Sequence, residues 1–158
     1  MSFKIKYLPI GVLTVVTNAV SPPVSGGELT IVNPPKLYDP TPNGYSTAVT
    51  APVSAKLAFI SGQGGQSESG DFSPDFAAQV KQAYANLCAV LEGLDAKPDQ
   101  VIKLTIYVVD HDMSKLEVLT RNVKEVFGNK LPAQTLVPVP KLAIEPMLFE
   151  VEAVVLIK

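Results

Sequence analysis

The chain has 158 residues, 47% hydrophobic and 18% charged, which is the length and composition of one globular domain with a sizeable core. Its formal net charge of -2 gives no electrostatic basis for binding nucleic acid or an anionic membrane surface, so we expect neither as a partner. A single cysteine and a single histidine exclude an internal disulfide and any Cys/His zinc cluster, which needs about four ligands.

Residues 1–32 are predicted to form an N-terminal extension. Two β-branched runs, VLTVV (12–16) and ELTIV (28–32), flank the turn-forming SPPVSGG, which predicts a β-hairpin. The alternative is a secretory signal, because two lysines and an apolar run precede small residues near Ala19. Pro9 and Gly11 interrupt that run and favour the hairpin, and with it a cytoplasmic location; a targeting segment would instead imply export or an organelle.

The next part of the chain predicts a connector, two strands and a glycine-rich loop. Residues 33–44 are rich in proline and are expected to be ordered without regular structure. The strands Tyr45–Thr50 and Leu57–Ser61 are expected to pair with each other. The loop SGQGGQSESGD (61–71) lacks the lysine of a phosphate-binding loop. It is either a turn whose backbone approaches a ligand closely or a plain surface loop.

An amphipathic helix follows this loop. Ser73 is predicted as its N-cap, Pro74 as its first residue and Gly93 as its end. Cys88 lies in the apolar stripe without a basic neighbour in sequence, so we interpret it as a core residue rather than a nucleophile.

The run VIKLTIYVVD (101–110) is the most continuous apolar strand and is expected at the centre of the sheet. Ser114 is predicted to cap a second helix that ends at Gly128. His111 lies between two acids and could handle protons, but a solvent-facing loop histidine is favoured because the sequence shows no further partner for it.

The last part of the chain predicts two strands, Gln134–Val139 and Met147–Ile157, joined by a turn at Pro140–Pro146. In the final strand, alternation places Phe149, Val151 and Ala153 on one face, and Leu148, Glu150 and Glu152 on the other. Carboxylates beside a core are costly, so Glu150 and Glu152 are expected to line a cleft or a subunit seam; a solvated edge is the alternative.

This order of elements predicts an α+β fold with both helices on one face of the sheet. The other face is expected to carry residues that a monomer would leave exposed to water and that partner subunits would cover. These residues are Leu104, Ile106, Leu148 and Val154.

Four segments together resemble the reactive intermediate deaminase family (Rid, or YjgF-like, often labelled L-PSP endoribonuclease). They are NGYSTAV (43–49), LAFISGQGG (57–65), VIKLTIYVVD (101–110) and LPAQTLVPV with FEVEA (131–153). The resemblance covers about residues 33–158, which we take as the domain. It implies a chorismate-mutase-like fold, a mixed sheet covered on one face by two helices, and a homotrimer with small-molecule clefts between its subunits. It implies neither a cofactor nor a metal.

In this family, enzymes hydrolyse enamines and imines such as 2-aminoacrylate to a 2-oxo acid and ammonia. The resemblance places the catalytic glutamate at Glu150, and the substrate-binding positions at Gly62, Tyr45 and Thr135. The arginine that grips the substrate carboxylate in the family falls on Gln134. We expect the terminal ribbon of one protomer to present both Glu150 and Gln134 to a pocket that its neighbour closes.

The exchange of arginine for Gln134 limits which function can be transferred. A neutral amide holds a carboxylate roughly five- to thirtyfold more weakly than a guanidinium does. The only arginine, Arg121, is predicted in mid-helix, and Lys141 offers a point charge without a planar fork. Gln134 therefore suits a ligand that bears a carbonyl, amide or hydroxyl group.

Three functions follow from these residues. The first is a trimer that binds a small metabolite between subunits, with any catalysis being hydrolysis that uses Glu150 as the base. The second is an enamine or imine deaminase, and the third is a regulatory or chaperone-like trimer without turnover. Ribonuclease activity is not supported, because the chain offers neither a paired acid and base nor a phosphate grip.

Overall fold

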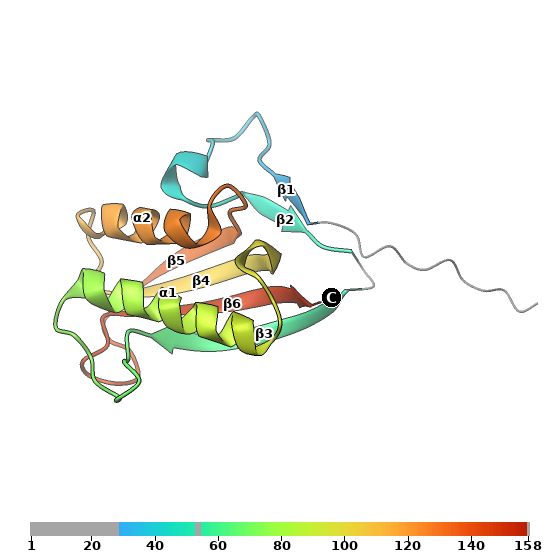
Figure 1. Ribbon diagram of the computed structural model, residues 1–158. Helices are drawn as coiled ribbons and strands as arrows, with labels where there is room; N and C mark the ends of the chain where they lie inside the picture. Colours follow the sequence, from blue (N-terminus) through green and yellow to red (C-terminus); the bar gives the residue numbers. More distant parts are fainter. Residues whose placement is uncertain (1–28, 53–54, 158) are drawn as a thin grey trace, which may run out of the picture.

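The computed structural model describes residues 29–52 and 55–157, and its main feature is a mixed four-stranded sheet with two helices on one face (Figure 1). The elements in chain order are β1 Thr30–Val32, β2 Ala48–Thr50, β3 Lys56–Gly64, α1 Phe76–Gly93, β4 Val101–Val109, α2 Lys115–Phe127, β5 Ala133–Val139 and β6 Phe149–Ile157. Two short 3-10 turns are η1 Thr41–Asn43 and η2 Pro98–Gln100. This is the α+β arrangement that the sequence predicts.

The strands of the main sheet lie in the order β3-β6-β4-β5. Strands β4 and β5 are parallel, while β6 is antiparallel to both β3 and β4. The most continuous apolar run, β4, is therefore central, as predicted. In β6, Phe149 and Val151 are buried while Glu150 and Glu152 are only partly covered, which confirms the predicted alternation.

The small second sheet differs from the prediction. Strand β2 pairs with β1 (Ile31 opposite Val49) and not with β3, whose partner is β6. The apolar residues of β3 match the length and pattern of the long strand β6, whereas β2 has only three residues to offer. The run VLTVV, the first strand of the predicted hairpin, lies outside the described residues.

The first helix begins two residues later than predicted. Its N-cap is Asp75, whose carboxylate accepts a hydrogen bond of 2.7 Å from the backbone N–H of Ala78. Ser73 instead accepts a hydrogen bond from the Asp75 N–H at 3.1 Å and so forms the turn before the helix. Ser114 does precede α2, but its hydroxyl bonds to Asp112 and caps no N–H of the helix.

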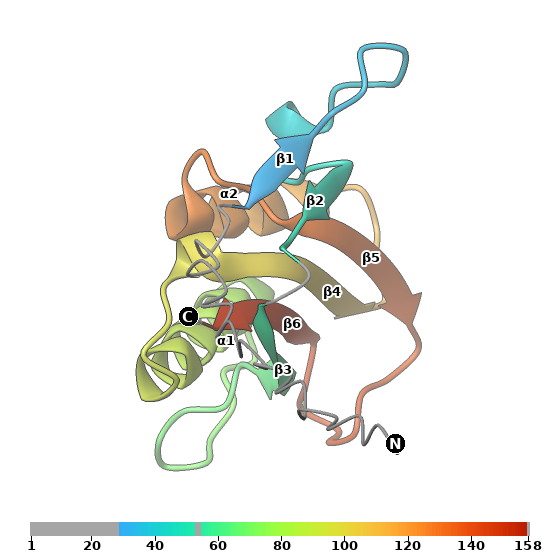
Figure 2. The ribbon, with the colours of Figure 1, turned by 90° about the vertical axis from the view of Figure 1, so that its right-hand side faces the viewer.

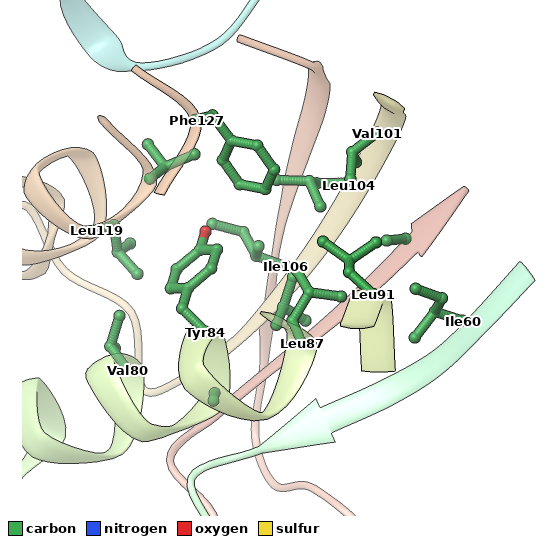
Figure 3. Close-up of a cluster of buried hydrophobic side chains, with 14 of the residues drawn as sticks. Ile60, Val80, Tyr84, Leu87, Leu91, Val101, Leu104, Ile106, Leu119 and Phe127 are labelled. Atoms are coloured by element: carbon green, nitrogen blue, oxygen red, sulfur yellow. The ribbon is translucent and has the colours of Figure 1, made fainter. Parts of the chain in front are cut away.

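The core fills the space between the two helices and the sheet (Figure 3). Tyr84 of α1 lies at its centre and makes edge contacts with Phe127 of α2 and a tilted contact with Phe149 of β6. Leu104 and Ile106 of β4 are also buried here, at 0% and 1% exposure, so the prediction that they lie on the uncovered face is wrong. The residues that alternate with them in β4, Lys103, Thr105 and Tyr107, are half-buried and face away from the helices.

Within residues 29–52 and 55–157, no helix lies over the second face of the main sheet, since α1 and α2 lie on the same side of the strands (Figures 1 and 2). Phe59 of β3 lies opposite Val154 of β6 on this face and is 78% exposed. Tyr107 and Glu150, paired across β4 and β6, share the same face. We call this surface the open face. Leu57, two residues before Phe59 and so on the same face of β3, is exposed as well, and neighbouring exposed apolar side chains are typical of a contact surface.

No helix in the described part of the chain combines the length and the apolar character that a membrane crossing requires.

Candidate functional site

The side chains predicted for the site lie on opposite faces of the main sheet. Gln134 of β5 lies opposite Leu104, which is buried beneath the helices. Glu150 of β6 lies opposite Tyr107. Because residues 104 and 107 of one strand point to opposite faces, Gln134 faces the helices and Glu150 belongs to the open face. The prediction that one protomer presents both to a single pocket is therefore wrong.

The first half of the site is a pocket of about 370 Å³ between α2 and the edge strand β5. It brings together three of the predicted residues, Tyr45, Gln134 and Thr135. The other residues that line it are Asn43, Ile106, Leu116, Leu119, Thr120 and Leu136. Its volume is that of a small-molecule site, and we call it the amide pocket.

The segment before β2 holds Tyr45 against β5. Gly44, at φ +82°, turns the chain there, and a Cβ on it would lie 2.5 Å from a methyl carbon of Val123. Ser46 then forms a bridge with Ala133 and donates a hydrogen bond of 2.6 Å to the Leu131 carbonyl. These contacts fix Tyr45 at the edge of the sheet, beside the strand that carries Gln134.

The amide oxygen of Gln134 is buried and accepts no hydrogen bond from any described residue. Buried acceptors are normally paired, so an unpaired one at a pocket is a place where a ligand can donate. The Thr135 hydroxyl, by contrast, accepts a hydrogen bond of 2.5 Å from Lys103. None of the described residues that line the amide pocket is a lysine, arginine or histidine.

The second half of the site is the pair Glu150 and Gly62. A Cβ built on Gly62 would lie 1.6 Å from a carboxylate oxygen of Glu150, so this carboxylate occupies the space that any other residue would need. The pairing of β3 with β6 shifts register between Ile60 and Gln63, which brings the backbone at Gly62 out of the regular ladder. The close approach of Glu150 thus requires a glycine here. The sequence predicted instead a loop that either approaches a ligand or lies plainly at the surface, whereas Gly62 lies within β3.

The carboxyl group of Glu150, on the open face, has a pKa above its usual range. Partial burial, and secondly the charge of Glu152, raise the pKa of Glu150. Burial and the neighbouring Glu152 likewise raise the pKa of the Tyr107 hydroxyl, with a smaller effect from Glu150. A carboxylate with a raised pKa is a stronger base once it has lost its proton.

Gln79 of α1 is a site-positioning residue that sequence reasoning missed. It is fully buried, and its amide donates hydrogen bonds to the Ser73 and Pro146 carbonyls at 2.7 and 2.6 Å. Its oxygen accepts a bond of 2.8 Å from the Leu148 N–H. Gln79 thereby holds Pro146 and Leu148, the residues just before β6, and so positions the start of the strand that carries Glu150. A glutamine within an apolar helix stripe was the signal available in the sequence.

Two further candidates, Cys88 and His111, are not among the described residues that line the amide pocket. Burial and the nearby Glu92 raise the pKa of the Cys88 thiol, which opposes the thiolate that a nucleophile needs. The Nδ1 atom of His111 is buried without a hydrogen-bond partner among the described residues. Over the same residues, no group of three or more His, Cys, Asp or Glu side chains could hold a metal ion.

Comparison with known proteins relates this geometry to one family. The family model described as endoribonuclease L-PSP matches residues 39–157. A RutC family protein of Aquifex aeolicus is 37% identical over 72% of this chain and 87% of its own length. The RutC family protein YjgH of Escherichia coli is 36% identical, but the match spans only 48% of this chain and 56% of that protein.

Solved structures agree with the sequence comparison. YyfB from Yersinia pestis, described as a protein of unknown function of the conserved Rid protein family, superposes with a TM-score of 0.79 at 30% identity. That alignment covers 83% of this chain and all of the Yersinia chain. RidA from an Antarctic Psychrobacter aligns with a TM-score of 0.60 at 27% identity, over 72% of this chain and 88% of its own.

Proposed function

The chain belongs to the endoribonuclease L-PSP family, the Rid family, and from this premise we propose that it is a homotrimer that binds a small metabolite between subunits and hydrolyses it as an imine or enamine. Each cleft would combine the amide pocket of one protomer with Glu150 and Gly62 of its neighbour. Tyr45 and Gln134 would contact the ligand with their side chains, and Glu150 would act on water. Thr135 would contact the ligand only through its main chain, because its hydroxyl bonds to Lys103 on the other face of the sheet.

The observation that carries this proposal is the division of the site between two faces of one sheet. The amide pocket holds ligand contacts but no carboxylate, while the open face holds the carboxylates and an exposed apolar surface. A ring of three subunits uses two different surfaces of each protomer, so it can join one half of the site to the other half on the next copy.

The chemistry requires a base and a place for the substrate nitrogen. Glu150 takes a proton from water as the water oxygen forms a bond to the imine carbon, and it passes this proton to the nitrogen, which gives a neutral carbinolamine. Glu150 then takes the hydroxyl proton of the carbinolamine and passes it to the amine nitrogen as the C–N bond breaks, which yields ammonia and a carbonyl product. The raised pKa of Glu150 brings it nearer to the pH at which a general base works best.

The residues that line the amide pocket favour a hydrolase of imines or enamines in general over a deaminase specialised for 2-aminoacrylate. That substrate carries a carboxylate, and no cation is found among the described residues that line the pocket. A regulatory or chaperone-like trimer without turnover is the third function, and it predicts that Glu150 can be changed without consequence for any reaction.

Rates of imine hydrolysis test the proposal. A serine dehydratase would supply 2-aminoacrylate, a flavin amine oxidase acting on isoamylamine would supply the neutral 3-methylbutan-1-imine, and carbonyl and ammonia release would be followed in both cases. We expect acceleration of at least one reaction, and a loss of roughly a hundredfold or more in Glu150→Gln. Equal rates with wild type, with Glu150→Gln and without protein, for both imines, would contradict hydrolysis and favour the non-catalytic trimer.

A further inference from the structure

The structure points to a ligand class for the amide pocket: we propose that it selects an uncharged ligand with an N–H or O–H donor and a short branched aliphatic group. The inference rests on the proposed function in that this ligand occupies the same cleft. It goes further by excluding the anionic class of substrate from preferred binding.

The aliphatic side chains that line the pocket indicate the hydrocarbon part of the ligand. Four aliphatic side chains line it: Ile106 and Leu119 are buried, and Leu116 and Leu136 are half-buried. These four side chains offer carbon surface and no polar atom, so they stabilise a branched hydrocarbon group and give a charged or strongly hydrated group nothing to bond. Tyr45 provides the aromatic surface that lines this space.

The amide oxygen of Gln134 indicates the polar group of the ligand. Gln134 lines the pocket, and its amide oxygen is buried with no hydrogen-bond donor among the described residues, so a ligand donor reaches it once the amide group turns toward the pocket. A ligand N–H would donate a hydrogen bond to this oxygen. A carboxylate would instead place its own lone pairs against those of the amide oxygen, which is unfavourable. An amide can turn its N–H side to an anion, but a neutral donor returns less than a cation does.

The lysines of the surrounding elements do not supply the missing cation. Each ammonium group already donates to oxygen atoms of this chain. The pairs are Lys103 to Thr135, Lys115 to the carbonyls of Val109 and Asp110, and Lys124 to the carbonyl of Pro42. None of these lysines, nor Arg121 of α2, is among the described residues that line the amide pocket.

A neutral imine satisfies both requirements. Its N–H donates to the Gln134 oxygen and its alkyl group packs on the leucines. In the proposed trimer, the imine carbon would then be open to water from the side of the neighbouring Glu150. Aldimines and ketimines formed by oxidation of simple amines belong to this class, whereas the imines of amino acids carry the carboxylate that the pocket does not match.

Three stable probes of nearly equal shape test the inference by isothermal titration of the full chain. Isovaleramide carries the isobutyl group and an N–H donor, isovalerate replaces the donor by a negative charge, and 4-methyl-2-pentanone replaces it by a methyl group. We expect isovaleramide to bind roughly three- to tenfold more tightly than either of the others, the range of one neutral hydrogen bond. Isovalerate binding as tightly as the amide, or no binding of isovaleramide, would overturn the inference.

Two variants show whether the preference comes from Gln134. We expect Gln134→Arg to reverse the order in favour of isovalerate, and Gln134→Leu to bring isovaleramide and the ketone to equal affinity. Gln82→Arg, on α1 outside the amide pocket, is the matched control and should keep the wild-type order. An unchanged order in Gln134→Arg, with cooperative thermal unfolding retained, would also overturn the inference.

The same probes separate this inference from the proposed function. If wild type hydrolyses 2-aminoacrylate faster than 3-methylbutan-1-imine and also prefers isovalerate, the ligand class is wrong while hydrolysis stands. If isovaleramide is preferred but neither imine is hydrolysed, hydrolysis is wrong while the ligand class stands.

Discussion

At the scale of single residues, the site depends on two side chains whose surroundings differ in kind. Glu150 lies against the bare backbone of Gly62, and its charge is opposed by burial and by Glu152. Gln134 lies among aliphatic side chains with its oxygen unpaired. Glu150 can accept a proton and Gln134 can accept a hydrogen bond. The proposed imine hydrolysis uses both, a base for water and an acceptor for the substrate N–H.

Gly62→Ala tests the role of the glycine. The new Cβ would overlap the Glu150 carboxylate, which must then turn away from its position, so we expect hydrolysis to fall roughly tenfold or more. A carboxylate at the end of a flexible side chain can move, so the thermal midpoint should change little. Gly93→Ala is the control, because a Cβ there meets nothing within 4 Å. Full activity in Gly62→Ala would contradict the placement of Glu150.

The pH dependence of Glu150→Gln tests its electrostatics. The folded pKa of Glu150 is above its usual value of 4.5, so the folded chain holds this proton more tightly than the unfolded chain. Its contribution to stability is therefore fully present below the usual pKa and is lost as the pH rises through the raised pKa. Above that range, we expect Glu150→Gln to raise the thermal midpoint by about 1–3 °C. Below the usual pKa the two proteins should unfold alike.

The same titration predicts an opposite trend for activity. Glu150 acts as a base only when deprotonated, so kcat in wild type should fall as the pH falls through the raised pKa. A rate profile that is flat across pH 4 to 8, together with full activity in Glu150→Gln, would show that another group is the base.

At the scale of elements, a helix residue controls how the last strand begins. Gln79 of α1 joins the turn before α1 to Pro146 and Leu148 before β6. Gly65 packs directly on it, since a Cβ there would lie 2.5 Å from the Gln79 Cα atom. The glycine-rich loop, the helix and β6 are thus held at one point.

Gln79→Leu should therefore be strongly destabilising. Three buried hydrogen bonds are lost and their partners are left without replacements, so we expect the free energy of unfolding to fall by about 2–4 kcal/mol. Gln82→Leu removes only a bond to Asn86 on the same helix and should cost less than about 1 kcal/mol. Urea unfolding measures both; equal losses would show that the Gln79 bonds contribute nothing specific.

Much of this element structure could be predicted from the sequence, because periodicity determines which residues of a strand or helix are buried. The alternation of β6 and the central place of β4 are examples. The face on which Leu104 lies could not be deduced. A strand with apolar residues at both odd and even positions does not show which set points into the core. The partner of β2 was missed because pairing depends on distant residues, and the N-cap because Ser73 and Asp75 are both good caps.

The same limit explains the outcome for the candidate site. Gln134 and Glu150 were named correctly as strand residues, and their strands were located to within two residues. Their faces are opposite, which follows only from the register of β5 and β6 on β4. Gln79 was missed because a buried glutamine is visible only when its three partners are known.

At the scale of the whole molecule, the open face is the surface that the proposed trimer would cover. Phe59 is 78% exposed on the side of the sheet that neither α1 nor α2 covers, and Glu150 lies on the same face. Covering this face with a second and third copy would bury the apolar surface and enclose the carboxylate at a pocket of the neighbour.

Phe59→Glu should prevent assembly. A charge in the contact surface would have to be buried without a partner, so we expect light scattering after size exclusion to change from trimer to monomer. Met113→Glu, at a side chain of nearly equal exposure (77%) outside the sheet, should leave the trimer intact. A wild-type monomer, or a Phe59→Glu trimer, would show that the open face is not the interface.

The division of the site between subunits can be measured most directly by mixing two inactive variants. Leu136→Trp fills the amide pocket and Glu150→Gln removes the base, so each homotrimer should hydrolyse 3-methylbutan-1-imine poorly. Trimers refolded from an equal mixture should recover about a quarter of the wild-type rate, because one in four clefts joins an intact pocket to an intact Glu150 of the neighbour. Mixed trimers no more active than the two variants alone would contradict a shared site.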